Sequence, residues 1–233
     1  MIIDKFIYSL GLGPGDPELV TVKALRIIES ADFVVVPQSD ELGRSVAKDI
    51  VSRYVKPEKI LMYYFPMNNK KEELDAKYSQ LADKIFDMLS TGANVCYVTM
   101  GDPTIFSTSN YLTKKLELKG IEVRHVPGIS SITGAASLIG IPICSKGDNF
   151  GVYELPPESA LAIEYINRHD TTIFMKVNKK LSTLQEAVRL CRPDKAYLAR
   201  RISLEGEMIY DLLTSTPPAD AGYLSIAIVK RKR

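Results

Sequence analysis

The sequence has few histidines and cysteines, a small net charge and no long apolar run. Its 233 residues include two histidines and three cysteines, and 30 basic residues against 28 acidic ones leave a formal net charge of +2. So small a net charge argues against a nucleic-acid partner. No apolar run reaches the roughly 18 residues that a membrane helix needs, and the first residues carry an acid rather than a signal-peptide pattern. We therefore expect a cytoplasmic protein with no membrane partner.

The few histidines and cysteines show no metal-binding pattern. Cys96, Cys144 and Cys191 form no C-x-x-C pair, and neither His125 nor His169 has metal-ligand spacing with a cysteine or a carboxylate. We expect reduced cysteines in the core, histidines that are structural or solvent-facing, and no protein-bound metal. The basic run at residues 230–233 is typical of a solvated chain end.

What the sequence does contain is a repeated alternation of strand and helix patterns. Strand patterns occur at residues 6–10, 32–37, 59–65, 94–100 and 122–126, and helix patterns at 45–54, 72–91 and 111–119. A further helix is opened by Thr21 and has Val22, Leu25 and Ile28 on one face. The stripe on the 72–91 helix consists of Leu74, Tyr78, Leu81, Ile85 and Met88. These patterns predict an α/β domain over residues 1–127.

The second half repeats the alternation on a smaller scale. Strand patterns occur at residues 150–155, 172–176, 196–201, 208–213 and 223–230, and helix patterns at 133–137, 159–168 and 180–191. The last two strands follow one another without long helices. We therefore expect a mixed sheet with an antiparallel end in a domain over residues 128–233.

The sequence VTMGDPTIFST, residues 98–108, joins a buried strand pattern to a helix pattern. Open α/β sheets bind ligands beyond the carboxyl ends of such strands. Gly101 would let a ligand approach the backbone, and Asp102 could accept hydrogen bonds from an amine or a hydroxyl. Ser107 or Thr108 could then cap the helix. The segment predicts a binding loop, while the tripeptide GDP alone also fits a plain turn.

A second glycine loop, GLGPGDP at residues 11–17, follows the first strand. It lacks the third glycine of the dinucleotide pattern G-x-G-x-x-G because Asp16 stands in its place, and this acid disfavours phosphate. A Rossmann-type methyltransferase and a plain tight turn both remain alternatives here. Between the two halves, Ser130 and Ser131 open a helix of small residues, where they could meet a ligand or only cap the helix.

Four segments in this order, GLGPGDPELVT, GDPTIFST, VPGISS and TIFMKV, together resemble the tetrapyrrole methyltransferases of cobalamin and sirohaem synthesis. The resemblance covers nearly the whole chain. It implies a class III methyltransferase fold, with a mostly parallel sheet in the first α/β domain and a mixed sheet in the second. It also implies S-adenosylmethionine in the cleft between the domains, S-adenosylhomocysteine as its product, and a homodimer.

The resemblance also implies roles for individual residues. The family's cofactor contacts fall on Pro14, Met100, Gly101, Asp102, Ile105, Ser130, Ser131, Met175 and Ile202. The first glycine loop resembles part of the trough for the tetrapyrrole, so the substrate-side candidates are Gly13, Gly15, Asp16, Phe106, Ser107, Thr108 and Arg44. Because the substrate is rich in carboxylates, Lys176, Arg200 and Arg201 are further cationic candidates.

Details of the motifs resemble one subgroup of the family. Val36 and Pro37 end the second strand where the uroporphyrinogen C-methyltransferases have a Tyr-Asp pair. These residues, FPM at 65–67 and the hydroxyls after the GDP loop resemble the precorrin-2 C20-methyltransferases, including the cobalt-factor II enzymes. Phe106 departs from that subgroup, which commonly has tyrosine there.

The reaction implied is an in-line methyl transfer to the C20 meso carbon of precorrin-2 or cobalt-factor II. Holding donor and acceptor in contact can supply roughly 7–11 kcal/mol of the barrier, which exceeds the contribution of one acid or base. We therefore name no catalytic acid or base. The alternatives are another tetrapyrrole C-methyltransferase, a diphthamide-type methyltransferase, which shares the first loop, and a non-catalytic module that binds a nucleotide-like ligand.

Overall fold

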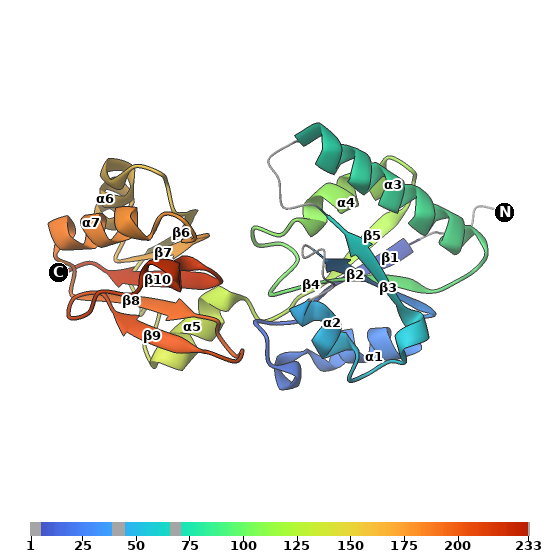
Figure 1. The fold of residues 1–233 in the computed structure, drawn as a ribbon, viewed down its shortest axis with the longest axis horizontal. Coiled ribbons are helices and arrows are strands. Elements are labelled where there is room, and N and C mark those ends of the chain that lie inside the picture. The colour runs from blue at the N-terminus through green and yellow to red at the C-terminus, as the bar shows by residue number, and fades with distance from the viewer. Residues whose placement is uncertain (1–5, 39–44, 66–70, 233) are drawn as a thin grey trace. The chain divides into compact units, whose positions relative to one another are not determined.

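The computed structural model describes residues 6–38, 45–65 and 71–232, and the chain divides into two compact units, residues 1–130 and 131–233 (Figure 1). The first unit is built on a parallel sheet. Its strands are β1 Phe6–Gly11, β2 Phe33–Gln38, β3 Ile60–Tyr64, β4 Val95–Thr99 and β5 Glu122–Val126, in the order β3-β2-β4-β1-β5. This order places the loops after β1, β4 and β5 side by side at the carboxyl edge of the sheet, where open α/β sheets bind ligands.

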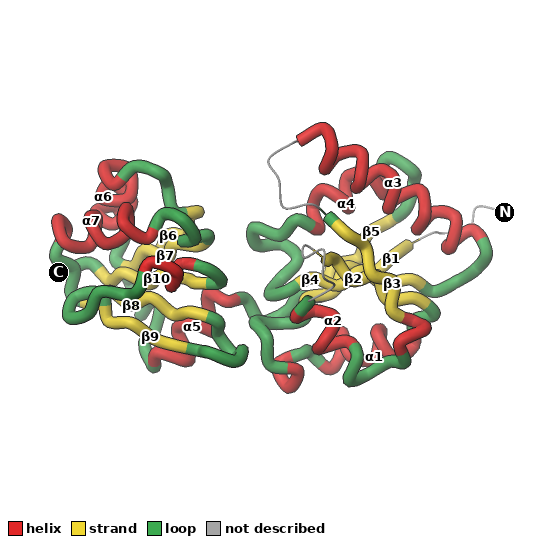
Figure 2. The backbone as a smooth tube through the Cα atoms, viewed as in Figure 1, coloured by secondary structure: helices red, strands yellow, loops and turns green. Residues whose placement is uncertain are grey.

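Helices cover both faces of the first sheet. α1 Val22–Ser30 and α2 Val46–Val51 lie on one face, and α3 Lys71–Ser90 and α4 Ser109–Glu117 lie on the other (Figures 1 and 2). Alternate residues of β4 serve two separate cores, since Tyr97 packs with residues of α3 and α4, and Cys96 and Val98 pack with residues of α1 and α2. Burial of both faces explains why the strand has a continuous apolar sequence. Short 3₁₀ helices precede α1 at Pro17–Leu19 and β3 at Pro57–Lys59.

The expected start of α1 is confirmed, and its expected buried face is partly wrong. Thr21 Oγ1 accepts a hydrogen bond from the backbone N–H of Ala24 at 3.2 Å, which caps the helix. Ile28 is buried as expected, but Val22 is 62% exposed, and Ala24 is buried in its place. A residue in the first turn lies at the end of the sheet, so helical spacing alone does not bury it. In α3, Tyr78, Leu81 and Ile85 are buried, while Leu74 and Met88 pack half-buried at the margin.

The second unit contains a mixed sheet. Its strands are β6 Phe150–Glu154, β7 Thr171–Met175, β8 Lys195–Arg200, β9 Met208–Asp211 and β10 Ser225–Lys230, in the order β6-β7-β10-β8-β9. β6 and β7 run parallel, whereas β10 is antiparallel to both β7 and β8, and β8 is antiparallel to β9. α6 Ser159–Arg168 and α7 Leu181–Cys191 pack over one core, while α5 Ser131–Ile139 contacts β8 and β10. A 3₁₀ helix, Ala219–Gly222, precedes β10. The expected α/β class and the antiparallel end of this sheet are confirmed.

The cysteines and histidines agree only in part with the expectations from the sequence. Cys96 is buried and Cys191 half-buried, and both are free thiols, but Cys144 is exposed, so its expected place in the core was wrong. His169 is structural: its Nε2 lies 2.6 Å from the Tyr153 hydroxyl and its Nδ1 lies 3.0 Å from Asn149 Oδ1. His125 is exposed. Within the described ranges, no helix is both long and apolar enough to cross a membrane.

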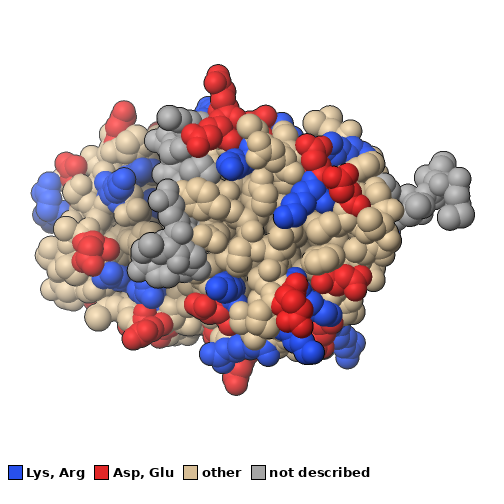
Figure 3. All heavy atoms as spheres, turned by 45° about the vertical axis from the view of Figure 1, so that its right-hand side comes forward, with Lys and Arg blue, Asp and Glu red and all other residues tan. Residues whose placement is uncertain are grey.

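Acidic and basic side chains are mixed on the face drawn in Figure 3. Lys and Arg residues alternate there with Asp and Glu residues, and no large area of that face carries one sign of charge. This mixture agrees with the formal net charge of +2. The face drawn in Figure 3 therefore shows none of the continuous basic surface that a nucleic-acid backbone requires.

Candidate functional site

Three glycines meet where β1, β4 and β5 end. A Cβ added to Gly11 would lie 2.5 Å from both the carbonyl oxygen of Gly101 and the backbone nitrogen of Gly128. A Cβ added to Gly128 would lie 2.2 Å from the same Gly101 oxygen. These distances are far shorter than a van der Waals contact with backbone atoms. Both positions must therefore be glycine for the three segments to approach one another. Gly101 has a different reason, because its φ of +68° lies in the left-handed region that favours glycine.

Hydrogen bonds join the loop after β1 to the loop after β4. The backbone N–H of Gly13 donates to the carbonyl of Gly101 at 3.2 Å, and the N–H of Gly101 donates to the carbonyl of Gly13 at 2.7 Å. The N–H of Leu12 donates to the carbonyl of Thr99 at 2.9 Å. An antiparallel bridge between Gly13 and Gly101 therefore joins the two loops beyond the edge of the sheet.

Asp102 joins the loop after β4 to the loop after β5. Its Oδ1 accepts from the backbone N–H of Thr104 at 2.8 Å and from Thr104 Oγ1 at 2.5 Å, and its Oδ2 accepts from the N–H of Gly128 at 3.1 Å. We call Gly11, Gly13, Gly101, Asp102 and Gly128 the glycine platform. Both carboxylate oxygens thus have partners inside the protein, so a role of Asp102 as an acceptor for cofactor groups stays a prediction.

The glycine platform leaves room for a ligand against its backbone. A Cβ added to Gly101 would meet no atom within 4 Å, so the space beside this residue is open. A cofactor recognised through main-chain groups fits such a place, because glycine allows close approach. Met100 packs half-buried against the core next to it, and Ile105 is half-buried in the same loop. In the part of the chain that the structure describes, no group of three His, Cys, Asp or Glu residues is placed to hold a metal ion.

The loop after β1 is shaped by Asp16. Its Oδ1 accepts a hydrogen bond from the N–H of Glu18 at 2.8 Å, which caps the short helix that follows. The Tyr54 hydroxyl donates to the carbonyl of Pro17 at 2.7 Å, and burial raises the pKa of this tyrosine. Pro14 and Gly15 are buried within the loop. Of the two roles expected for Asp16, the observed bond corresponds to holding the shape of the loop.

The hydroxyl residues after the GDP segment form hydrogen bonds within the protein. Ser107 Oγ lies 3.1 Å from Thr99 Oγ1 and 2.8 Å from Ser109 Oγ, and it accepts from the N–H of Ser109 at 3.2 Å. Ser107 therefore caps the first turn of α4, as one of the two expected residues. Thr108 makes no capping bond. Burial raises the pKa of the nearby Tyr78, and the Thr108 side chain lowers it in part.

Phe106, directly before Ser107, has a strained backbone conformation. Its φ is +46°, and its side chain is 42% exposed. Residues on left-handed backbone gather at binding and catalytic sites, and Phe106 follows β4 at the edge where open α/β sheets bind ligands. The ring is therefore available to pack against a bound molecule.

The remaining predicted residues lie in separate places. Ser131 is the first residue of α5, and Ser130 lies two residues after Gly128, whose N–H is bound by Asp102. Met175 ends β7, and Ile202, which is 6% exposed, follows β8 at the same edge of the second sheet. Arg44 lies outside the described residues. The sequence analysis did not single out Gly11, Thr104 or Gly128. The two glycines could have been found, because each stands at the end of a strand pattern.

Comparisons with known proteins show the family of the chain. The family described as Tetrapyrrole (Corrin/Porphyrin) Methylases matches residues 7–216 of the chain. The chain is 34% identical to the probable cobalt-precorrin-2 C(20)-methyltransferase of Methanocaldococcus jannaschii over 235 residues, which cover 97% of this chain and 96% of the relative.

Two solved structures are similar to the fold. A cobalt precorrin-4 methyltransferase, a cobalamin biosynthetic enzyme, gives a TM-score of 0.74 at 19% identity, covering 96% of this chain and 94% of that one. A uroporphyrin-III C-methyl transferase of Thermus thermophilus, complexed with S-adenyl homocysteine, gives a TM-score of 0.66 at 21% identity, covering 97% of each chain. The chain is therefore an S-adenosylmethionine-dependent methyltransferase and belongs to the tetrapyrrole (corrin/porphyrin) methylases.

Proposed function

We propose that the protein methylates the C20 meso carbon of precorrin-2 or of its cobalt form, cobalt-factor II, in cobalamin biosynthesis. The observation that carries the proposal is the 34% identity to a probable cobalt-precorrin-2 C(20)-methyltransferase over nearly the full length of both chains. Val36 and Pro37 at the end of β2 also favour this subgroup over the uroporphyrinogen enzymes. Any cobalt in the reaction belongs to the substrate, and we propose no metal bound by the protein itself.

The cofactor, when bound, supplies a methyl group on a positively charged sulfur. The residues proposed to bind it are Pro14, Met100, Gly101, Asp102, Ile105, Ser130, Ser131, Met175 and Ile202. The open space beside Gly101 lets a ligand approach the backbone closely, and Met175 supplies a soft apolar surface. The bonds of Asp102 keep the Gly101 backbone and the Gly128 segment in fixed relation. A pre-organised backbone lowers the entropy cost of binding.

The chain's contribution to the transfer is positioning and exclusion of water. The proposed substrate-side residues are Gly13, Gly15, Asp16, Phe106, Ser107, Thr108 and Arg44. The exposed ring of Phe106 can cover the reacting groups, and the bonds of Ser107 hold its loop in place. Positioning alone can supply roughly 7–11 kcal/mol of the barrier. No side chain is therefore assigned as the proton acceptor.

Steady-state assays with three tetrapyrroles test the proposal. Precorrin-2, cobalt-factor II and uroporphyrinogen III are each incubated with S-adenosylmethionine, and S-adenosylhomocysteine is measured as the product. We expect turnover with precorrin-2 or cobalt-factor II and none with uroporphyrinogen III. Turnover with uroporphyrinogen III alone would overturn the assignment to the C20 subgroup and leave the family membership unchanged.

We also propose that the protein is a homodimer, on the resemblance to its family and because a chain of 233 residues buries two modest sheets incompletely. Light scattering at micromolar concentration measures the mass directly. A monomer mass of 25.9 kDa would contradict the proposal. The cytoplasmic location expected from the sequence stays a prediction.

A further inference from the structure

Backbone strain gathers at one edge of the second sheet. Among the described residues, seven residues other than glycine have a φ between +46° and +63°. Five of them lie in loops at this edge: Lys176, Lys179, Arg201, Ser203 and Leu224. β7 and β8 end at this edge, and the antiparallel β10 begins there, as the pairing of Ser225 with Arg200 shows. The edge therefore contains most of the strained positions in the described chain.

Cations occupy three of the five strained positions. Left-handed backbone is unfavourable for any residue with a Cβ, and glycine adopts it freely. Strained residues that persist in folded proteins gather at binding and catalytic sites. Lys176, Lys179 and Arg201 have φ values of +58°, +63° and +52°, and all three are cations. A positive charge is the property that glycine could not supply at these positions.

The loop that carries the two lysines is firmly held. Val177, between them, is fully buried in the core of the second unit. Gly222 lies so close that an added Cβ would be 3.1 Å from the carbonyl oxygen of Val177. Lys180 Nζ donates to the carbonyl of Leu155 at 2.5 Å. Val177 and Lys180 thus anchor the loop inward, while Lys176 and Lys179 are exposed.

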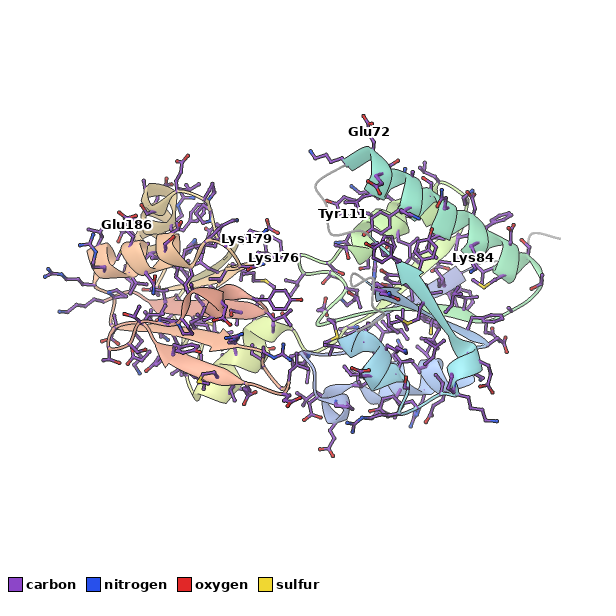
Figure 4. The ribbon with its side chains drawn as sticks, in the orientation of Figure 1. Glu72, Lys84, Tyr111, Lys176, Lys179 and Glu186 are labelled. Carbon is purple, nitrogen blue, oxygen red and sulfur yellow. The ribbon has the colours of Figure 1, made fainter. Side chains whose placement is uncertain are left out.

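Among the residues that the structure describes, neither exposed lysine has an acidic partner. The ion pairs in the described part of the chain involve other residues and include neither Lys176 nor Lys179. Arg200 differs, because it donates to Asp220 at 3.0 Å. Figure 4 shows Lys176 and Lys179 close together at the end of β7. The two charges therefore lie on one anchored loop and are available to an anion.

We propose that Lys176 and Lys179 bind carboxylate side chains of the tetrapyrrole substrate. The inference rests on the proposed function for its ligand class, a macrocycle rich in carboxylates. An ammonium group on a flexible stem is a point charge that can follow carboxylates placed around a ring. Exposed ion pairs are individually weak and are screened by salt, so the two lysines act together and most strongly at low ionic strength.

The test is a titration with uroporphyrin, a stable tetrapyrrole that carries carboxylates, followed by its absorbance at low salt. Lys176→Gln and Lys179→Gln remove the charges and keep the side-chain length. Each is expected to raise the Kd by about threefold to fivefold, and the double variant by about tenfold or more. The matched control is Arg192→Gln, because Arg192 is an exposed cation on left-handed backbone, with a φ of +47°, at the end of α7. This control should leave the Kd unchanged.

Glycine variants separate charge from backbone. Lys176→Gly and Arg192→Gly both place glycine on left-handed backbone, so both should keep or raise the unfolding temperature. Only Lys176→Gly should weaken uroporphyrin binding. Lysine variants that bind within about twofold of the wild type, or a wild-type protein that binds no uroporphyrin, would overturn the inference. Absence of methyl transfer by the wild type overturns the proposed function alone, because the titration needs no turnover.

Discussion

Replacement of Asp102 by asparagine removes one hydrogen bond of the glycine platform and leaves two. The carbonyl oxygen of an asparagine can keep both bonds from Thr104, but its amide nitrogen cannot accept the N–H of Gly128, which lies 3.1 Å from Oδ2 in the native protein. A hydrogen bond to a charged group contributes roughly 1.5–3 kcal/mol. Because Asp102 is half-buried, we take the lower end, about 1.5 kcal/mol of unfolding free energy.

The same change should weaken cofactor binding. The Gly128 segment leads directly to Ser130 and Ser131, so its release loosens two proposed cofactor contacts. We expect the Kd for S-adenosylhomocysteine to rise by about tenfold, the equivalent of about 1.4 kcal/mol. Thr104→Val keeps the shape of Thr104 and removes its Oγ1 donor, so it should lower stability by about 1 kcal/mol. Since Thr104 acts through Asp102, the two changes should not be additive in the double variant.

Urea unfolding and titration calorimetry measure the two quantities. One result would contradict this reasoning: Asp102→Asn keeps the native unfolding free energy, but its Kd for S-adenosylhomocysteine rises by more than about 100-fold. The carboxylate would then bind the cofactor directly, and its bonds inside the protein would be incidental. Asp16→Asn serves as the control, because Asp16 caps a short helix in the neighbouring loop. It should change the Kd for the cofactor little.

The remaining predictions concern packing, the aromatic ring and the thiols. Gly11→Ala should lower the unfolding free energy by about 3 kcal/mol, because its Cβ would lie 2.5 Å from two backbone atoms. Gly92→Ala should lower it by only about 1 kcal/mol through backbone strain, because its Cβ would meet no atom within 4 Å. Chemical denaturation compares the two variants. Phe106→Tyr should change the single-turnover rate less than about tenfold, or roughly 1.4 kcal/mol of barrier, and Phe106→Ala more, since the ring excludes water; a large gain with tyrosine would show that a hydroxyl is required. Iodoacetamide at pH 8 should modify the exposed Cys144 first and Cys96 only after unfolding, because burial raises the pKa of Cys96 to about 12; peptide mass analysis reads the order, and early modification of Cys96 would contradict its burial.

Local sequence patterns were enough to predict the elements and their order. The buried strands β2 and β4 have continuous apolar runs, and the helices show their apolar spacing, so the α/β class follows from periodicity. The cap of α1 by Thr21 was also readable, because it depends on neighbours in sequence. The exposure of Val22 could not be read from the sequence, because it depends on where the helix begins relative to the sheet.

The loops that meet at the candidate site could be predicted from the sequence, and the contacts between them could not. The loop after β4 was expected to bind a ligand, but the meeting of Gly11, Gly101 and Gly128 joins three segments that are far apart in sequence. No local pattern could show that Thr104 holds the Asp102 carboxylate. The strained backbone of Lys176 was likewise hidden, since left-handed conformation is predicted mainly for glycine.

The position of the transferred methyl group tests the central claim most directly. Precorrin-2 and cobalt-factor II are each incubated with the protein and S-adenosylmethionine that carries a ¹³C-labelled methyl group, and the product is analysed by mass spectrometry and carbon NMR. The account predicts a product one methyl group heavier, with the label bonded to the C20 meso carbon. A product labelled at any other carbon, or no labelled product from either tetrapyrrole, would contradict it.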